Sequence, residues 1–333
     1  MSMNPSAQGG LWMRVTQRIQ WWLKCWRRQV DGWLARRGPR VFIGVHWPPP
    51  FRKPFERSQL RFRSEGGGIG DELLCSAIFA EIKRRNPQTH ITFFSRYPDF
   101  FQGHSQIDVI APIQEGGDSI MLSYGNALPP PRSLASMMAE TIGLQMKFPK
   151  IPTPQLRSPI EKLSQTLEAI PGPWIAIQPL SSRWTPNKAW PLAAWETLIR
   201  LLTKTHHVVE LGTATAFPDH DFGAQFHSLA GCTDLNNFAY ALSKAGAFVG
   251  PPSGGMHLAN AFGVPLVIIF GGYEAPVDYD YPNMESFFTP LKCSPCWLSD
   301  KCPYEHECLK AVRPEEVYPA VLRALEKTAL PIK

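Results

Sequence analysis

The sequence has no continuous run of about 20 apolar residues, the length that a helix needs to cross a lipid bilayer. It shows no cleavage pattern of a secretory signal peptide and no internal repeat. Only 19% of its 333 residues are charged, and nothing in the body of the chain is typical of a reader of bases. We therefore expect neither a membrane span nor a secreted precursor, and no nucleic-acid partner.

Basic residues are concentrated before residue 64, where 13 Lys and Arg face only 2 acids, while the remaining chain is net acidic. Residues 11–37 place apolar side chains, several of them Trp, on one helical stripe with arginines over much of the rest. Such a helix typically lies in the surface of an anionic membrane. We therefore expect residues 1–59 to form an arm that is peripheral at the inner, cytoplasmic face of the cytoplasmic membrane. The alternative is a helix docked on the rest of the chain or on a second subunit.

Short apolar runs alternate with helical patterns through most of the chain, which favours an α/β fold with parallel sheets. The length fits two doubly wound, Rossmann-like domains that face a cleft, with ligands at the C-terminal ends of the strands. We expect the domains at residues 60–150 and 174–313, a Pro-rich linker at 151–173 and a C-terminal helix at 314–333. The predicted strands are residues 60–63, 91–95, 108–111, 119–123, 174–178, 207–211, 247–250 and 266–270.

Residues 248–272, FVGPPSGGMHLANAFGVPLVIIFGG, form the pattern of a buried strand, a glycine-rich turn, a helix and a second buried strand. The glycines permit close backbone approach, and the start of the helix points free N–H groups and a positive dipole end at an anion. The alternative for the glycine-rich turn is that it only turns the chain and binds no ligand. The alternative for His257 is a histidine packed in the core. The expected phosphate-binding residues are Ser253, Gly254, Gly255, Met256 and His257.

A second polar cluster follows the predicted strand at residues 174–178. Ser181 and Ser182 offer hydroxyl groups, and Lys188 comes just before a helix that opens at Trp190-Pro191. Hydroxyls and a lysine at the C-terminal end of a strand suit a diphosphate. The alternative for Lys188 is a solvated loop lysine.

A third motif, GGGIGD, follows the first predicted strand and leads into a helix with apolar residues at four-residue spacing. Asp71 lies in the first turn of that helix. A carboxylate at this position either caps the helix or serves as a functional acid or base.

Taken in order, residues 65–87, 181–199 and 248–272 resemble glycosyltransferase family 9, the heptosyltransferases that build the inner core of bacterial lipopolysaccharide. The resemblance covers about residues 60–328 and implies a GT-B type fold. It also implies inverting transfer of a heptose from the nucleoside diphosphate sugar ADP-heptose to a saccharide or lipid-linked acceptor. No cofactor is required for this catalysis.

The resemblance gives the three clusters distinct roles. The family residue that matches Asp71 is the proposed general base, which takes a proton from the acceptor hydroxyl. Lys188, the hydroxyls of Ser181 and Ser182, and the backbone donors of residues 253–256 would stabilise the diphosphate leaving group.

Two departures from the family pattern concern the donor. Pro252 stands where family members usually carry Asp, and residues 211–225 lack the usual Glu for a nucleotide ribose. Asp219 or Asp221 is the candidate substitute. The first half is also short for the family, which leaves the identity of the acceptor open. One alternative to an enzyme is a catalytically inactive, membrane-attached scaffold protein that binds a nucleotide sugar.

Four of the seven cysteines lie within 16 residues, at Cys293, Cys296, Cys302 and Cys308. Four thiolates at short spacing suit a tetrahedral structural metal, zinc or iron, with reduced cysteines and disulfides as the alternatives. Protein-glycosylating heptosyltransferases are similar in having a cysteine-bound iron, so a metal here would favour a protein-directed heptosyltransferase.

Overall fold

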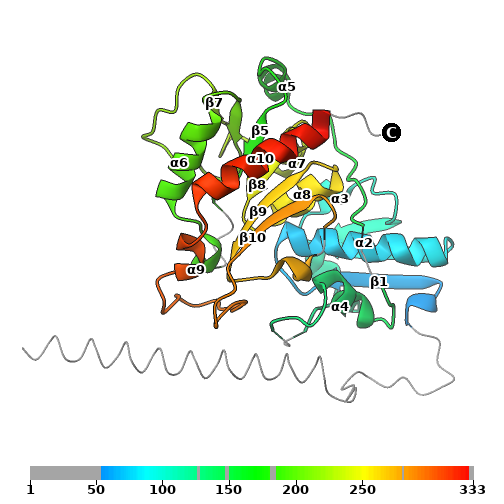
Figure 1. The fold of residues 1–333 in the computed structure, drawn as a ribbon. Helices are drawn as coiled ribbons and strands as arrows, with labels where there is room; N and C mark the ends of the chain where they lie inside the picture. The colour runs from blue at the N-terminus through cyan, green and yellow to red at the C-terminus, as the bar shows by residue number, and fades with distance from the viewer. Residues whose placement is uncertain (1–53, 126–127, 147–149, 181–184, 280, 330–333) are drawn as a thin grey trace, which may run out of the picture.

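The computed structural model describes residues 54–125, 128–146, 150–180, 185–279 and 281–329. Within them, the chain forms two sheets with helices packed around them (Figure 1). The first sheet contains four parallel strands in the order β3-β2-β1-β4. These strands are β1 (Gln59–Ser64), β2 (His90–Ser95), β3 (Val109–Pro112) and β4 (Ile120–Leu122).

The second sheet contains six parallel strands in the order β10-β9-β8-β5-β6-β7. In both sheets the strand order reverses beside the first strand, between β1 and β4 and between β5 and β8. Ligands of open parallel sheets bind at the C-terminal ends of the strands at such reversals. The strands are β5 (Ile175–Ile177), β6 (Val208–Glu210), β7 (Phe226–Ser228), β8 (Ala247–Gly250), β9 (Leu266–Gly271) and β10 (Met284–Phe288).

Helices connect the strands and cover the sheets. The two that begin at the reversals are α2 (Ile69–Arg85), after β1, and α8 (Gly254–Ala261), after β8, and they contact one another. The others are α3 (Pro98–Phe101), α4 (Leu134–Glu140), α5 (Glu161–Glu168), α6 (Leu192–Leu202), α7 (Leu235–Ser243), α9 (Glu307–Lys310) and α10 (Pro314–Ala329). Single 3₁₀ turns lie at η1 (Pro54–Glu56), η2 (Ile113–Glu115), η3 (Pro186–Lys188) and η4 (Pro276–Asp278).

Burial follows the sequence pattern closely. The continuous apolar runs AFVG and LVIIFG become β8 and β9, which are buried along their whole length at the centre of the second sheet. In α6 the apolar stripe of Trp195, Leu198, Ile199 and Leu202 is buried, as its spacing predicts. All eight predicted strands form, and the α/β fold with parallel sheets is confirmed.

The linker and the C-terminal helix differ in detail from the expectation. The Pro-rich segment contains α5, and the backbone N–H groups of Arg157 and Ile160 donate to Asn236 and Asn237 of α7. Helix α10 packs on α6, β8 and β9 of the second sheet. The domain limits themselves stay predictions.

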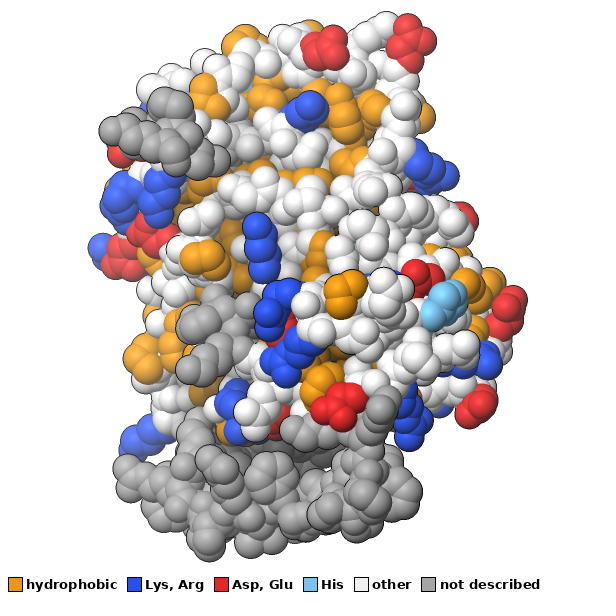
Figure 2. Space-filling view, turned by 90° about the vertical axis from the view of Figure 1, so that its right-hand side faces the viewer, with side chains coloured by type: hydrophobic (Ala, Val, Ile, Leu, Met, Phe, Trp, Pro, Cys, Tyr) orange, Lys and Arg blue, Asp and Glu red, His pale blue; other side chains and the backbone are white. Residues whose placement is uncertain are grey.

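Most of the basic arm, residues 1–53, lies outside the described residues, so its expected membrane contact stays a prediction. None of the helices in the described ranges has the length and apolar character of a membrane span. Figure 2 shows one face of the molecule, on which basic and acidic side chains are interspersed with apolar and uncharged ones.

Candidate functional site

A cavity of about 920 Å³ lies where the C-terminal strand ends of the two sheets face one another. Residues 65–71, which run from the end of β1 into the first turn of α2, form one wall, and residues 252–255, which run from the end of β8 into α8, form another. The loop after β6 contributes Gly212 and Thr213, and the start of α7 contributes Asp234. The cavity therefore occupies both strand-order reversals at once, where a ligand is expected.

Two glycines let the first turns of α2 and α8 approach each other at the floor of this cavity. A Cβ atom on Gly70 would lie 2.6 Å from Cδ2 of His257, and one on Gly254 would overlap Cγ2 of Ile69. Neither position has room for a side chain unless its neighbour moves. The glycines of both motifs are thus needed for contact between the two halves of the molecule.

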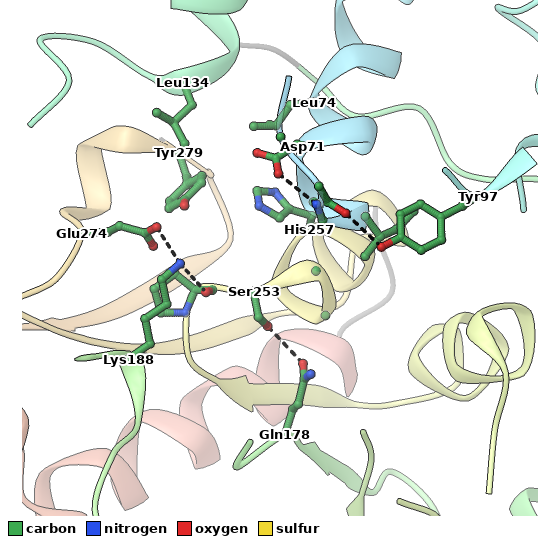
Figure 3. Close-up of a pocket in the computed structure, with 18 of the residues that line it drawn as sticks. Asp71, Leu74, Tyr97, Leu134, Gln178, Lys188, Ser253, His257, Glu274 and Tyr279 are labelled. Atoms are coloured by element: carbon green, nitrogen blue, oxygen red, sulfur yellow. Dashed lines mark hydrogen bonds and ion pairs between the residues drawn. The ribbon is translucent and has the colours of Figure 1, made fainter. Parts of the chain in front are cut away.

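Asp71 both caps α2 and faces the cavity (Figure 3). Its Oδ2 accepts a hydrogen bond from the Gly68 backbone N–H at 3.2 Å. Burial raises the pKa of the carboxyl, while the Gly68 N–H and the charge of Lys188 oppose that rise. The next residue, Glu72, is buried and accepts hydrogen bonds from the Ser95 hydroxyl and the Arg96 N–H, so it fixes the end of β2. Of these two adjacent acids, Asp71 is the one placed to act on a ligand.

Lys188 lines the cavity and its side chain is only 15% exposed, so it is not a solvated loop lysine. Its Nζ lies 2.6 Å from Oε1 of Glu274, 3.4 Å from the Pro252 carbonyl oxygen and 4.9 Å from the Tyr273 ring centroid. The carbonyl of Pro252 thus reaches the lysine at the position where the family pattern has an acid.

The residues just before Lys188 are held by the four-cysteine segment. The Asn187 side-chain amide donates to the backbone oxygens of Leu298 and Asp300, and the Thr185 hydroxyl donates to Leu298 as well. These bonds join residues more than 100 positions apart in the sequence. They fix the 3₁₀ turn η3, which carries Lys188. The expected partners Ser181 and Ser182 lie outside the described residues.

The turn that we expect to bind phosphate begins α8, with Ser253 as the residue before its first turn. The Ser253 hydroxyl donates to Oε1 of Gln178 at 3.0 Å, and Gly255 leaves room for that side chain. Ser253, Gly254 and Gly255 line the cavity, whereas the side chain of Met256 is fully buried, which leaves only its backbone for a ligand.

His257 is both a packed histidine and part of the cavity wall. The ring lines the cavity but is 5% exposed, and its Nδ1 lies 2.5 Å from the Tyr281 hydroxyl. Burial, together with the charge of Lys188, lowers the pKa of His257 to about 3. The imidazole is therefore neutral near pH 7 and offers a ligand a hydrogen bond but no charge.

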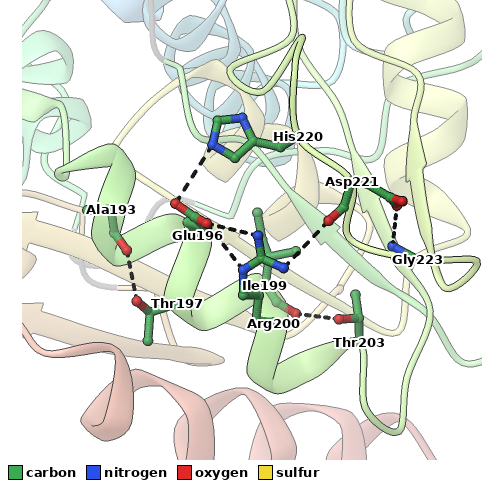
Figure 4. A network of polar contacts seen from close by, with 9 residues as sticks. All are labelled: Ala193, Glu196, Thr197, Ile199, Arg200, Thr203, His220, Asp221 and Gly223. Carbon is green, nitrogen blue, oxygen red and sulfur yellow. Dashed lines mark hydrogen bonds and ion pairs between the residues drawn. The ribbon is translucent and has the colours of Figure 1, made fainter.

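The structure does not support Asp219 or Asp221 as ribose-binding residues, because neither lines the cavity. Asp221 belongs to a polar network at α6, where its backbone oxygen accepts from Arg200 and its Oδ1 accepts from the Gly223 N–H (Figure 4). Glu196 of α6 completes this network by pairing with Arg200. Asp234, at the start of α7, is an acid of the same half that does line the cavity.

The sequence patterns did not identify Glu274 and the aromatic side chains that surround Lys188. Glu274 follows β9 and is 3% exposed, and burial raises its pKa, opposed by Lys188 and Tyr279. Trp297 packs against Tyr273 and Tyr124, with ring centroids 5.6 and 6.3 Å apart, and joins the two halves. A lone acid in a loop and scattered aromatic residues have no periodicity that would reveal them.

The four-cysteine metal site is not found in the described part of the chain, which holds no group of three or more His, Cys, Asp or Glu placed to bind a metal. Cys293, Cys296, Cys302 and Cys308 form no disulfide bond in the described part of the chain, so the disulfide alternative is not supported either. Burial, with Cys293 and Cys302 nearby, raises the pKa of Cys308 to about 11, so this side chain is a thiol at neutral pH. The segment instead contributes Trp297 to the wall of the cavity. The backbone N–H of Trp297 donates to the Tyr273 carbonyl oxygen.

One family model matches part of the chain. The model of glycosyltransferase family 9 (heptosyltransferase) matches residues 120–279. No curated protein matches the sequence significantly.

Solved structures share the fold at low sequence identity. The ADP-heptose lipopolysaccharide heptosyltransferase II of E. coli is 16% identical with a TM-score of 0.60, covering 81% of this chain and 100% of that one. A family 9 glycosyl transferase from Veillonella parvula is 14% identical with a TM-score of 0.61, covering 82% and 99%. The dodecameric iron-containing heptosyltransferase TibC, solved with ADP-D-beta-D-heptose, is 17% identical with a TM-score of 0.61, covering 82% and 79%. The GT-B type fold is confirmed.

Proposed function

We propose that the chain moves a heptose from ADP-heptose to a lipopolysaccharide-type saccharide acceptor with inversion at the anomeric carbon, because the model of glycosyltransferase family 9 matches residues 120–279. The basic arm of residues 1–59 supports a site of action at the cytoplasmic membrane face. Solved structures with the same fold include a lipopolysaccharide heptosyltransferase and a protein solved with ADP-D-beta-D-heptose, which supports the choice of donor.

One observation carries this proposal: Asp71 and Lys188 line the same cavity, each at the end of a different sheet. An inverting transfer needs a base on one face of the sugar and a stabilised leaving group on the other. The Asp71 carboxylate would take the proton of the acceptor hydroxyl as the oxygen attacks the anomeric carbon. The bond from that carbon to the diphosphate oxygen breaks at the same time, and ADP leaves with the electron pair.

Three groups would hold the leaving diphosphate. Lys188 supplies a positive charge, and the start of α8 supplies backbone N–H groups and the positive end of its dipole. The Ser253 hydroxyl lies at the same turn. A donor preorganised in this way lowers the barrier by about 2.7–4 kcal/mol.

The test is transfer from ADP-heptose to truncated lipopolysaccharide saccharides and to polypeptide acceptors, followed by ADP release and by the mass of the product. We expect heptosylated saccharide from the full chain and a loss of about 10²–10⁴-fold in Asp71→Asn. The matched control is Asp118→Asn, an exposed acid of the same half outside the cavity. Transfer by Asp71→Asn at the unaltered rate would remove the base assignment. Exclusive transfer to polypeptide would replace the acceptor, and nucleotide binding without any transfer would support a scaffold.

A further inference from the structure

Glu274 is a buried carboxylate in the cavity that the proposed function assigns to a negatively charged diphosphate. It follows β9 in the GGYEAP loop, and Figure 3 shows its carboxylate directed toward Lys188 at the centre of the site. Burying a charge costs several kcal/mol unless it is paired and hydrogen-bonded. The cost of burying this carboxylate therefore indicates a role other than stabilising the fold.

Other buried glutamates of the chain show what a structural role requires. Glu210 accepts hydrogen bonds from the Ala216 N–H and from the hydroxyls of Thr215 and Ser228. Glu72 accepts from a hydroxyl and a backbone N–H. Both are held by neutral groups of the fold, so neither depends on a charged partner.

Glu274 is held differently. Oε1 accepts from Lys188 at 2.6 Å. Oε2 makes no hydrogen bond of ordinary geometry to a described residue, although the Tyr279 hydroxyl is near enough to favour the charged form. The main partner of this carboxylate is thus the same lysine that the diphosphate would recruit.

A diphosphate and Glu274 cannot both keep Lys188 as a close partner without repulsion between their charges. Asp71, a second carboxylate, lines the same cavity, so the negative charge is already in excess near the lysine. When Lys188 turns to the phosphate oxygens, Glu274 loses its main hydrogen-bond donor and can accept from other groups. Hydroxyl groups are the neutral donors that a sugar brings to this place, and hydrogen bonds from hydroxyls to a carboxylate are short and strong.

We infer that Glu274 is a specificity-determining residue: it holds Lys188 in the free protein and accepts hydrogen bonds from hydroxyls of the donor sugar once Lys188 has moved to the diphosphate. This inference rests on the proposed function. The sugar must lie between the diphosphate and Asp71, and Glu274 faces that space beside the rings of Tyr273 and Tyr279. Aromatic walls with a few directed polar groups are typical of sites for small polar ligands.

The test compares ADP with ADP-heptose by calorimetric titration of the full-length protein and Glu274→Gln. Because the substitution removes the carboxylate that competes for Lys188, we expect ADP to bind Glu274→Gln as tightly as wild type or more tightly. Because the substitution also removes the acceptor for sugar hydroxyls, we expect ADP-heptose to lose about ten- to a hundredfold in affinity. The matched control is Glu285→Gln, an acid on β10 outside the cavity, which should change neither.

A loss of affinity for ADP-heptose without a loss for ADP separates this role from a structural one. Equal weakening of ADP and ADP-heptose in Glu274→Gln, or no change in either, would overturn the inference and leave the proposed function standing. Failure of wild type to bind ADP would overturn both. If Glu274→Gln does not fold, Glu274→Asp replaces it, because it keeps the charge on a shorter side chain. We expect Glu274→Asp to keep its affinity for ADP and to lose part of its affinity for ADP-heptose. An unchanged ratio of the two affinities would refute the role.

Discussion

Removing Lys188 tests how strongly the cavity depends on its buried ion pair. Lys188 and Glu274 have side chains only 15% and 3% exposed, and their charged atoms are 2.6 Å apart. Substitution of one partner leaves the other charge buried and unpaired, which typically costs about 3–5 kcal/mol. We therefore expect Lys188→Ala to lower the free energy of unfolding by about that amount at pH 8. Lys188→Ala/Glu274→Gln leaves no buried charge at this pair, so it should recover most of the loss.

The pH dependence provides a second check on the same pair. Burial raises the pKa of Glu274, and without Lys188 the pKa rises further. The folded variant then holds a proton that the unfolded chain releases above about pH 4.5, so its stability falls as pH rises from there. Urea unfolding of wild type and both variants at pH 5 and pH 8 measures these differences. A loss in Lys188→Ala below 1 kcal/mol at pH 8, or a double variant no more stable than the single one, would refute the reasoning.

Three further predictions follow from burial and close packing of particular residues. The acid limb of the pH profile of kcat/KM for transfer should lie above the range of an ordinary aspartate, because burial raises the pKa of Asp71; a limb at or below pH 4 would count against Asp71 as the base. Gly254→Ala should weaken ADP at least tenfold in calorimetry, because its Cβ would overlap Ile69, whereas Gly117→Ala, with nothing within 4 Å, should bind normally; equal affinities would contradict the close approach of α2 and α8. Burial raises the pKa of Asp278 to about 7, so wild type should lose up to about 1.4 kcal/mol of stability per pH unit between pH 4 and 7. Denaturant unfolding of Asp278→Asn across this range should show a flatter dependence, and an identical slope would argue that Asp278 does not titrate there.

The fold was largely predictable because its central strands are continuous apolar runs. β8 and β9 are buried on both faces, so their sequences contain no polar interruption. The strands that sequence analysis missed are β7 and β10, which lie at the two edges of the second sheet and are only half-buried or exposed. Edge strands mix polar with apolar residues, and runs as short as the three residues of β7 and the five of β10 have no readable period.

The site was predictable where it follows a local motif and unpredictable where it depends on packing between distant segments. Asp71 and Ser253 each stand at the start of a helix after a strand, a place that sequence can recognise. Glu274 meets Lys188 across 86 residues, and the loop around it gives no signal of that contact. The same limit applies to the cysteines, whose spacing predicted a metal site that the described residues do not show. Their segment contains Leu298, which accepts a hydrogen bond from Asn187, and Trp297, which bonds to Tyr273.

The measurement that tests the central claim most directly is calorimetric titration of the full-length protein with ADP, UDP and GDP. We predict one ADP per chain, bound more tightly than UDP or GDP, and weakened in Lys188→Ala/Glu274→Gln but not in Glu274→Gln alone. Tighter binding of UDP or GDP would contradict ADP-heptose as the donor while keeping a nucleotide site. Absence of binding for all three nucleotides would contradict a donor site between Asp71 and Lys188.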